Sequence, residues 1–336
     1  MMNILYLSDN NYAIYMGISM ISLFENNKDL KEINVYIIDD NIEQDNKKIL
    51  QDITQQYKRQ IIFLDISDGI SKLQALKAPL YRGSYTTYLK LFTFQLLPDE
   101  VHRIFFIDSD SLVVGSLKEL DKVDMQGNPV AAVLDNLCVF DKMHLGYDQD
   151  CIWCNMGVML VDVDKWKEMH CEQLVIEQMK KRSAYVAVDQ NLLNISLYGH
   201  ITVLNPRYNV TQHHVVYSYK AFLKNFPMNN FYSEEVMTEA VEHPVIHHFE
   251  RFIGESPWHK DNVTVYNDEF DYYLELSPWK DLEKKKAQTN LTLKIEKLLF
   301  KILPHDVFLI IYRFAYKRYV IKTNKILEEG IENISV

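Results

Sequence analysis

Glycine and proline are scarce in this chain, with 10 glycines and 9 prolines among 336 residues. So few of either excludes a collagen-like or linker-rich architecture. No apolar run approaches the roughly 18–20 residues that a membrane span requires. Residues 1–7 also lack the basic start, long apolar core and small-residue cleavage site of a signal peptide. With 48% hydrophobic and 24% charged residues, the composition is that of a soluble globular protein, and we expect it in the cytoplasm.

Cysteine is rare as well. The four cysteines, at positions 138, 151, 154 and 171, are too few for a disulfide scaffold in a chain of this size. Cys151 and Cys154 form a C-x-x-C pair, but a zinc site needs a second pair at similar spacing. A redox pair of the thioredoxin type begins a helix, whereas Cys154 begins a strand-like segment. We therefore expect reduced thiols with neither role.

Net charge is unevenly distributed along the chain, negative over most of it and positive near its end. The formal net charge is −10, yet residues 284–325 hold eleven Lys or Arg against only Glu296 and Asp306. That segment therefore carries +9, and the remainder −19. Phosphate backbones are bound by clustered Lys and Arg, so an acidic body argues against a nucleic-acid partner.

Short β-rich runs alternate with helical patterns over the first two-thirds of the chain. The pattern predicts strands over 3–7, 33–38, 61–66 and 103–108, with helices over 13–27, 42–58 and 85–97. Such alternation indicates an α/β fold of Rossmann-like type, with a mainly parallel sheet flanked by helices. We expect this domain to cover residues 1–265 and a helical, basic extension to cover 266–336.

Ligands of such sheets bind beyond the carboxyl ends of the strands, which draws attention to segments 7–13 and 105–115. Neither G-x-G-x-x-G nor G-x-x-x-x-G-K-[ST] occurs in the chain, which excludes the dinucleotide fingerprint and P-loop phosphoryl transfer. With so few glycines, a bound nucleoside diphosphate would need a metal ion to hold its phosphates.

Asp108-Ser109-Asp110 ends a strongly apolar strand. Carboxylates two positions apart on an extended segment point the same way. Two such oxygen donors can share a hard divalent cation, with diphosphate oxygens and water completing an octahedron. The alternative is that one aspartate caps the following segment and the other is solvated.

Six blocks together resemble a known family. They are YLSDNNYA (6–13), IDSDSLV (107–113), CNMGVMLVDVDKW (154–166), VDQNLLN (188–194), LNPRYN (204–209) and VIHHF…PWH (245–259). In this order they resemble glycosyltransferase family 8, which includes bacterial lipopolysaccharide galactosyl- and glucosyltransferases and the glycogenins. The resemblance implies a GT-A fold and retaining transfer of a hexose from UDP-galactose or UDP-glucose with Mn²⁺ or Mg²⁺. The acceptor would be a saccharide, lipid-linked or glycoprotein.

The resemblance also implies roles for individual residues. Asp108, Asp110 and His248 match the metal ligands, and the adjacent His247 would point to the opposite face of its strand. Gln190 and Asp189 match a catalytic pair near the anomeric carbon. The implied donor-binding residues are Ser8, Asp9, Asn11, Tyr12, Lys90, Asp108, Ser109, Asp135, Asn155, Gly157 and Gly254. Retention by double displacement would use Asp189 as the nucleophile, and same-face return needs none. The sequence leaves both open.

Three positions depart from the family pattern. Lys90 stands where the family usually has Arg, which keeps the charge but loses the bidentate fork. Ser256 replaces the Lys of G-x-x-K-P-W, for which Arg251, His259 and Lys260 are candidate substitutes. Met156 replaces a small residue and is expected to narrow the sugar pocket.

The basic end of the chain predicts two helices. Leu291, Ile295, Leu298, Leu299 and Ile302 fall on one face of a helix over 291–303, Pro304 breaks it, and a second helix begins in 305–322. Basic, aromatic-rich amphipathic helices can lie on an anionic membrane surface, here the inner face of the plasma membrane. The alternative is a hairpin that packs on the catalytic domain or forms a homodimer. On the membrane hypothesis, truncation after about residue 280 abolishes liposome binding and preserves donor hydrolysis.

Two other functions compete with the transferase. An apolar strand ending in D-x-D is also the first motif of haloacid-dehalogenase-like phosphatases, with Asp108 as nucleophile. That hypothesis leaves the other five blocks unexplained. The second alternative is a catalytically degenerate protein that binds nucleotide sugars or glycans, suggested by Ser256 and Lys90. Donor hydrolysis without acceptor distinguishes it from an active transferase.

Overall fold

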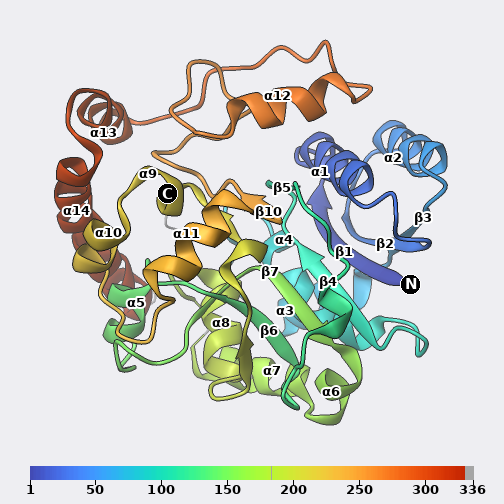
Figure 1. Cartoon of the computed structure of the whole chain (residues 1–336). Coiled ribbons are helices and arrows are strands. Elements are labelled where there is room, and N and C mark those ends of the chain that lie inside the picture. The colour runs from blue at the N-terminus through green and yellow to red at the C-terminus, as the bar shows by residue number, and fades with distance from the viewer. Residues whose placement is uncertain (183, 330–336) are drawn as a thin grey trace.

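The computed structural model describes residues 1–182 and 184–329, which form a central sheet between two layers of helices (Figure 1). Over these described residues the main sheet has seven strands in the order β3-β2-β1-β4-β7-β6-β8. Their bounds are β1 Met2–Asp9, β2 Ile33–Asp40, β3 Gln60–Leu64, β4 Arg103–Ile107, β6 Val130–Leu134, β7 Cys154–Asp162 and β8 Ile201–Val203. Only β7 runs antiparallel to its neighbours, β4 and β6, within this described sheet. The predicted mainly parallel α/β fold is confirmed.

Side chains of successive strand residues alternate between the two faces of the sheet and build two separate cores. Ile4 and Tyr6 of β1 join one core, and Leu5 joins the other. The first face is covered by α1 (Ala13–Asn26), α2 (Gln44–Gln56) and α12 (Asn267–Glu275). The second is covered by α3 (Ser67–Ala75), α4 (Thr86–Leu89), α6 (Val163–Glu168), α7 (Cys171–Lys181) and α8 (Val188–Ser196). Such strands, buried on both faces, read in the sequence as nearly continuous apolar runs.

The single helix predicted over 85–97 is wrong. The segment forms α4 and then two 3₁₀ turns, η1 (Lys90–Phe92) and η2 (Phe94–Leu96). Thr93 Oγ1 donates to the Leu89 carbonyl at 2.8 Å, and such back-bonding by threonine competes with regular helical geometry. The other predicted helices and strands of this region are present, with ends that differ by a few residues.

A second, smaller sheet joins distant parts of the chain. It contains β5 (Ser111–Val113), β10 (Ile246–His248) and β9 (Val210–Thr211), with β10 in the middle. β10 is antiparallel to β5, so that His248 pairs with Ser111, and the Phe249 amide donates to the Asp110 carbonyl at 2.9 Å. This pairing brings β10 alongside the segment that follows β4. The connections also contain α5 (Val139–His144), α9 (Gln212–Val216), α10 (Tyr219–Asn225), α11 (Glu234–Glu242) and the 3₁₀ turns η3 (Leu120–Lys122) and η4 (Pro206–Tyr208).

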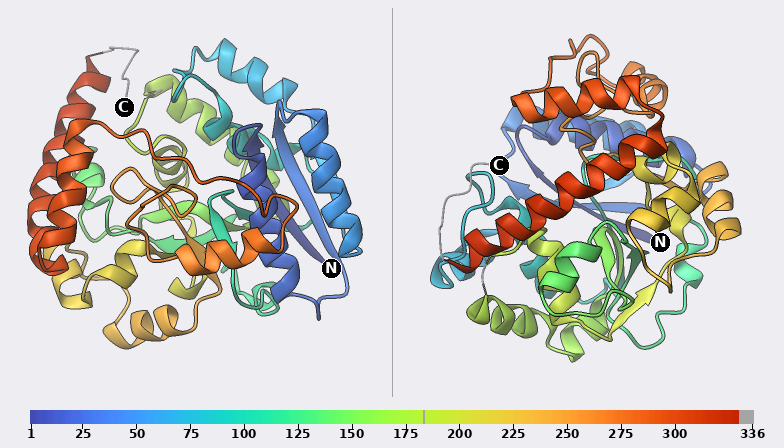
Figure 2. Two further views of the ribbon diagram at one scale, coloured as in Figure 1. Left: turned by 90° about the horizontal axis from the view of Figure 1, so that it is seen from above. Right: turned by 90° about the vertical axis from the view of Figure 1, so that its left-hand side faces the viewer.

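The two predicted C-terminal helices are α13 (Leu291–Ile302) and α14 (His305–Glu328), separated at Pro304. They lie along one side of the molecule, where α14 crosses the surface in the right-hand view of Figure 2. An apolar cluster holds α14 against α5 and α10; its buried members include Phe140, Phe222, Phe226, Phe308, Leu309 and Val320. Thus α14 is packed on the α/β body.

A buried polar contact adds to this packing. The fully buried Asn324 donates to Asp141 Oδ1 at 2.7 Å, and Asn191 of α8 donates to Oδ2 of the same carboxylate at 2.6 Å. The domain boundary predicted at residue 265 stays a prediction. The first helix beyond it, α12, packs on α1 of the α/β body. Residues 330–336 of the predicted extension lie outside the described residues.

Candidate active site

A cavity of about 470 Å³ opens at the carboxyl ends of β1 and β4. Nine of its lining residues are predicted site residues, namely Ser8, Asp9, Asn11, Tyr12, Lys90, Asp108, Ser109, Asp110 and Asp189. Leu7 lines it as well, and six further polar or aromatic residues complete the wall: Tyr81, Arg82, Ser84, Thr86, Thr87 and Arg251. The cavity therefore lies where the rule for parallel α/β sheets places a ligand.

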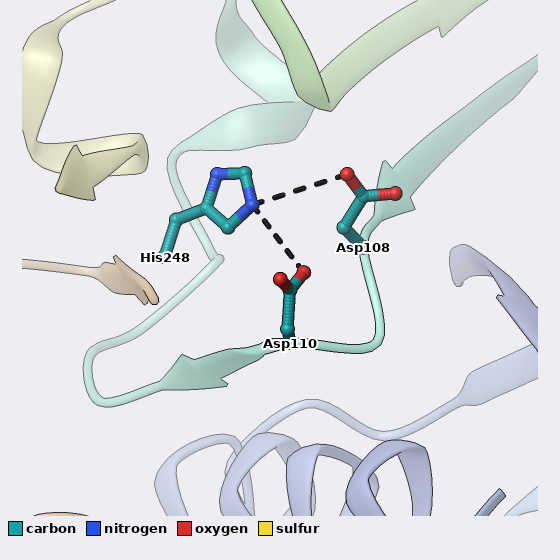
Figure 3. A group of neighbouring side chains, drawn as sticks. All are labelled: Asp108, Asp110 and His248. Carbon is teal, nitrogen blue, oxygen red and sulfur yellow. Dashed lines mark ion pairs between the residues drawn. The ribbon is translucent and has the colours of Figure 1, made fainter. Parts of the chain in front are cut away.

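Asp108, Asp110 and His248 converge at this cavity (Figure 3). His248 Nε2 lies 3.4 Å from Asp110 Oδ1 and 3.9 Å from Asp108 Oδ2, and one ligand atom from each residue falls within 4.8 Å of the others. Two carboxylates and one imidazole suit a divalent cation such as Mn²⁺. Gly157 makes room for the group: a Cβ there would lie 2.4 Å from the His248 ring and 2.6 Å from Asp108 Oδ2.

The orientation of His248 is fixed from its other ring nitrogen. Nδ1 lies 3.0 Å from Asn209 Oδ1, and the Asn209 amide donates to Asn155 Oδ1 at 2.9 Å. A hydrogen bond from Nδ1 leaves Nε2 free as a metal ligand. His247 faces away, with Nδ1 2.5 Å from Glu269 Oε2 and its ring stacked on Tyr266.

The three groups perturb one another's pKa values. Burial raises the pKa of Asp108 to about 6, in spite of the nearby Lys90 ammonium. Burial also opposes ionisation of Asp110 and His248, but their mutual hydrogen bond and attraction outweigh it. The pKa of Asp110 is therefore lowered, and that of His248 is raised to about 9. A cation bound by these three groups would displace any proton from His248 Nε2.

Lys90 lines the cavity although it is only 2% exposed. Its Nζ lies 2.5 Å from Asp189 Oδ2, 2.8 Å from the Met156 carbonyl and 3.9 Å from Asp108 Oδ1. Burial disfavours the ammonium, but the charges of Asp108 and Asp189 outweigh burial and raise the lysine pKa. Lys90 therefore organises the protein's own carboxylates, and Asp189 is held in an ion pair.

The remaining predicted residues lie beside the metal group. Gln190 Nε2 donates to Asp135 Oδ2 at 3.0 Å, and Gln190 Oε1 accepts from the Met156 amide at 3.3 Å. Asp135 and Asn155 line a narrow second cleft. Gln190 is thus bonded to Asp135, which lines the same cleft as Asn155.

Gly254 is not among the residues that line either cavity. It lies in the Phe252–Glu255 turn with φ +75°, where a Cβ would come within 2.7 Å of Leu293 of α13. Its positive φ favours glycine, whereas the flexible Leu293 methyl could shift to admit a Cβ.

Sequence reasoning missed Glu250, which also lines the second cleft. Asn155 Nδ2 donates to Glu250 Oε1 at 2.5 Å, and burial raises the glutamate pKa to about 7. The backbone of Glu250 has φ +26°, a strained value for a residue with a side chain. Glu250 is two residues after His248, but it belongs to no sequence motif. The direction of its side chain depends on this local backbone conformation, which the sequence pattern does not predict.

The three candidates to replace the family lysine differ in position. Ser256 is buried, and the ring of His259 accepts a hydrogen bond from the Ser256 amide at 2.9 Å. The Lys260 amide donates to the Lys285 carbonyl, and neither Lys260 nor His259 lines the cavity. Arg251 does line it, with Nη2 3.3 Å from the Tyr12 hydroxyl.

A mainly parallel α/β sheet with an Asp-x-Asp pair at a strand end, and a histidine from a neighbouring small sheet beside that pair, is typical of glycosyltransferases of the GT-A fold. The sequence profile described as glycosyl transferase family 8 matches residues 3–262. The chain therefore belongs to glycosyltransferase family 8, as the resemblance indicated, and the haloacid-dehalogenase alternative is set aside.

Individual relatives agree with this assignment. General stress protein A of Bacillus subtilis is 27% identical over 83% of this chain and 94% of its own length. Lipopolysaccharide 1,2-glucosyltransferase of Escherichia coli K12 is 27% identical over 87% of this chain and 83% of its own. A crystal structure of the galactosyltransferase LgtC with donor and acceptor sugar analogues matches with a TM-score of 0.66 at 23% identity, covering 82% of this chain and 96% of that one. This last likeness confirms the predicted GT-A fold.

Proposed function

We propose that this protein is a retaining glycosyltransferase that moves glucose or galactose from a UDP-sugar to a saccharide acceptor in a reaction dependent on Mn²⁺ or Mg²⁺. The observation that carries the proposal is the convergence of Asp108, Asp110 and His248 at the mouth of a cavity of about 470 Å³. Asp9, Asn11 and Tyr12 line the same cavity and are proposed to hold the nucleoside.

Charge develops at two places during such a transfer: negative charge on the leaving diphosphate and positive charge at the anomeric carbon. A divalent cation held by Asp108, Asp110 and His248 supplies electrostatic stabilisation of the diphosphate as it leaves. On the sugar side, the Asp135 carboxylate and the Gln190 amide oxygen can stabilise positive charge at the anomeric carbon. Asp189 is already ion-paired with Lys90 at 2.5 Å, an arrangement that weakens it as a nucleophile. We therefore favour same-face return over double displacement.

The class of acceptor is proposed by analogy with two relatives of this chain. The Escherichia coli relative is named a lipopolysaccharide glucosyltransferase, and a Salmonella relative at 23% identity is named a lipopolysaccharide 1,3-galactosyltransferase. We propose a saccharide acceptor, lipid-linked or carried on a glycoprotein.

The proposal is tested by incubating the protein with a panel of UDP-sugars and measuring released UDP. With Mn²⁺ we expect turnover of UDP-glucose or UDP-galactose, and EDTA should reduce it to background because the leaving diphosphate loses its counter-charge. Adding Mn²⁺ back in excess is the control for EDTA. A protein that binds UDP and hydrolyses no sugar of the panel would instead be the degenerate binding protein.

The exposed face of α13 and α14 is apolar and bordered by basic residues. Leu291 is 72% exposed, Leu298 59% and Phe314 60%, and Ile295, Ile302, Val307, Ile310, Ile311 and Tyr319 are exposed too. Over the described part of the chain, no helix is both long and apolar enough to cross a membrane. The net +9 of this segment suits an anionic surface. We propose peripheral attachment to an anionic membrane, with a homodimer as the alternative occupant of this face.

Point substitutions test this attachment better than truncation, because truncation would uncover Phe140 and Phe226, which pack against α14, and deprive Asp141 of its Asn324 partner. We expect the double variant Leu298→Glu with Phe314→Glu to bind phosphatidylglycerol vesicles at least about tenfold more weakly, since each buried apolar side chain contributes about 1.5–3 kcal/mol. The measurement is vesicle co-sedimentation.

The matched control for the vesicle experiment is Tyr272→Glu, which changes an exposed aromatic residue on α12. Unchanged vesicle binding in the double variant would contradict the membrane proposal. A wild-type dimer that the double variant converts to a monomer in light scattering would assign the face to a homodimer.

A further inference from the structure

The charged side chains that line the cavity of about 470 Å³ are not all paired with an opposite charge. Four carboxylates, Asp9, Asp108, Asp110 and Asp189, face three cationic side chains, Lys90, Arg82 and Arg251. Asp9 accepts a hydrogen bond from the Tyr12 amide at the start of α1, where the helix dipole offsets its charge. A divalent cation together with Lys90 neutralises the other three carboxylates. The two arginines then remain without a counter-charge.

Arg251 comes from the loop that follows β10. Its Nη2 lies 3.3 Å from the Tyr12 hydroxyl, and the Asp110 carboxylate is close enough to favour its charged form. Within the described residues it makes no ion pair closer than 4.0 Å. The guanidinium is therefore held between the proposed nucleoside end of the cavity and the metal group, with N–H groups to spare.

Arg82 comes from a different segment. It lies in a tight turn closed by Tyr81 and Ser84, with φ +50°, and its guanidinium sits 5.3 Å from the centre of the Tyr81 ring. No ion pair of Arg82 is found among the described side chains either. Stacking on an aromatic ring orients a guanidinium and leaves its N–H edge free.

We propose that Arg82 and Arg251 bind the diphosphate of the nucleotide donor from two separate loops, in place of a motif lysine at position 256. This inference rests on the proposed function. A guanidinium presents two parallel N–H groups to phosphate oxygens, so two of them can balance the negative charge that the metal group leaves uncompensated. Ser256, buried and uncharged, has no such capacity.

Calorimetric titration with UDP, UMP and uridine in the presence of Mn²⁺ tests this assignment. We expect Arg251→Ala and Arg82→Ala each to weaken UDP binding about tenfold, the double variant more, and uridine binding to stay within twofold. Arg251→Lys should recover part of the loss. Lys118→Ala, which removes an exposed cation far from the cavity lining, is the control.

Two outcomes would overturn the proposal. If both alanine variants bind UDP within twofold of the wild type while the wild type hydrolyses a UDP-sugar, the arginines do not hold the diphosphate and the proposed function stands. If the variants lose uridine and UDP equally, the arginines shape the cavity instead. Failure of the proposed function has a different signature, because the wild type itself then hydrolyses no UDP-sugar, whether or not it binds UDP.

Discussion

Replacing Asp110 by alanine is expected to reduce Mn²⁺-dependent hydrolysis of the UDP-sugar at least about 100-fold, the usual effect of losing one electrostatic stabiliser of the transition state. Asp110 Oδ1 is the carboxylate oxygen closest to His248 Nε2, at 3.4 Å. Its removal leaves one carboxylate and a histidine, too few protein ligands to hold the cation firmly. The measurements are UDP release and Mn²⁺ affinity, the latter from electron paramagnetic resonance of free Mn²⁺.

The matched control is Asp99→Ala, since Asp99 is fully exposed and lies 3.5 Å from a surface lysine. Asp110→Asn keeps the side-chain shape and should lose nearly as much activity, which separates charge from packing. Thermal unfolding checks that the variants fold. Turnover in Asp110→Ala within a fewfold of the wild type would remove this group from the reaction.

The position of the Asp-x-Asp pair, half of the proposed metal site, could be predicted from sequence because it follows from local rules. An apolar run buried on both faces must be a strand, and polar residues at its end must fall at the sheet edge. Asp108 and Asp110 meet both conditions. His248 is different: only the family's order of blocks pointed to it, and the antiparallel pairing of β10 with β5 explains why it arrives beside Asp110.

The rest of the site depends on backbone conformation that local pattern does not encode. Glu250 and Arg82 both have positive φ, so their side chains leave the chain in directions that alternation does not predict. Lys90 lines the cavity, and the sequence did not reveal the three tertiary contacts of its ammonium group with Met156, Asp108 and Asp189.

Helical periodicity in the C-terminal segment predicted the apolar face of α13 but not what this face contacts. Of the five residues predicted to share one face of α13, only Leu299 packs on the body of the protein. Leu291, Ile295, Leu298 and Ile302 remain exposed. One of the residues that anchor α14, Asn324, is polar, and a buried asparagine cannot be distinguished by pattern from a solvated one.

Replacing Lys90 by methionine is expected to destabilise the metal-free protein by about 3–5 kcal/mol, the typical cost of removing one partner of a buried ion pair. Methionine keeps much of the volume but leaves Asp189 facing Asp108 with no cation between them. The Met156 carbonyl also loses its hydrogen bond from Lys90 Nζ at 2.8 Å, and the amide of the same residue donates to Gln190. Because this displaces a contact of Gln190, donor hydrolysis should fall as well. Urea unfolding in EDTA measures the stability.

The deficit in the Lys90→Met variant should depend on pH in a definite direction. The pKa of Asp108 is about 6 with Lys90 present, above its ordinary value, and loss of the ammonium raises it further. A carboxyl whose pKa is higher in the folded than in the unfolded state binds more protons when folded, so the variant gains stability as the pH falls. The deficit is therefore expected to be largest near pH 8 and smaller near pH 5. The control, Lys90→Arg, keeps the charge and should show little of this pH dependence. Equal stability of Lys90→Met and the wild type at pH 8 would contradict the prediction and mean that water already screens these carboxylates.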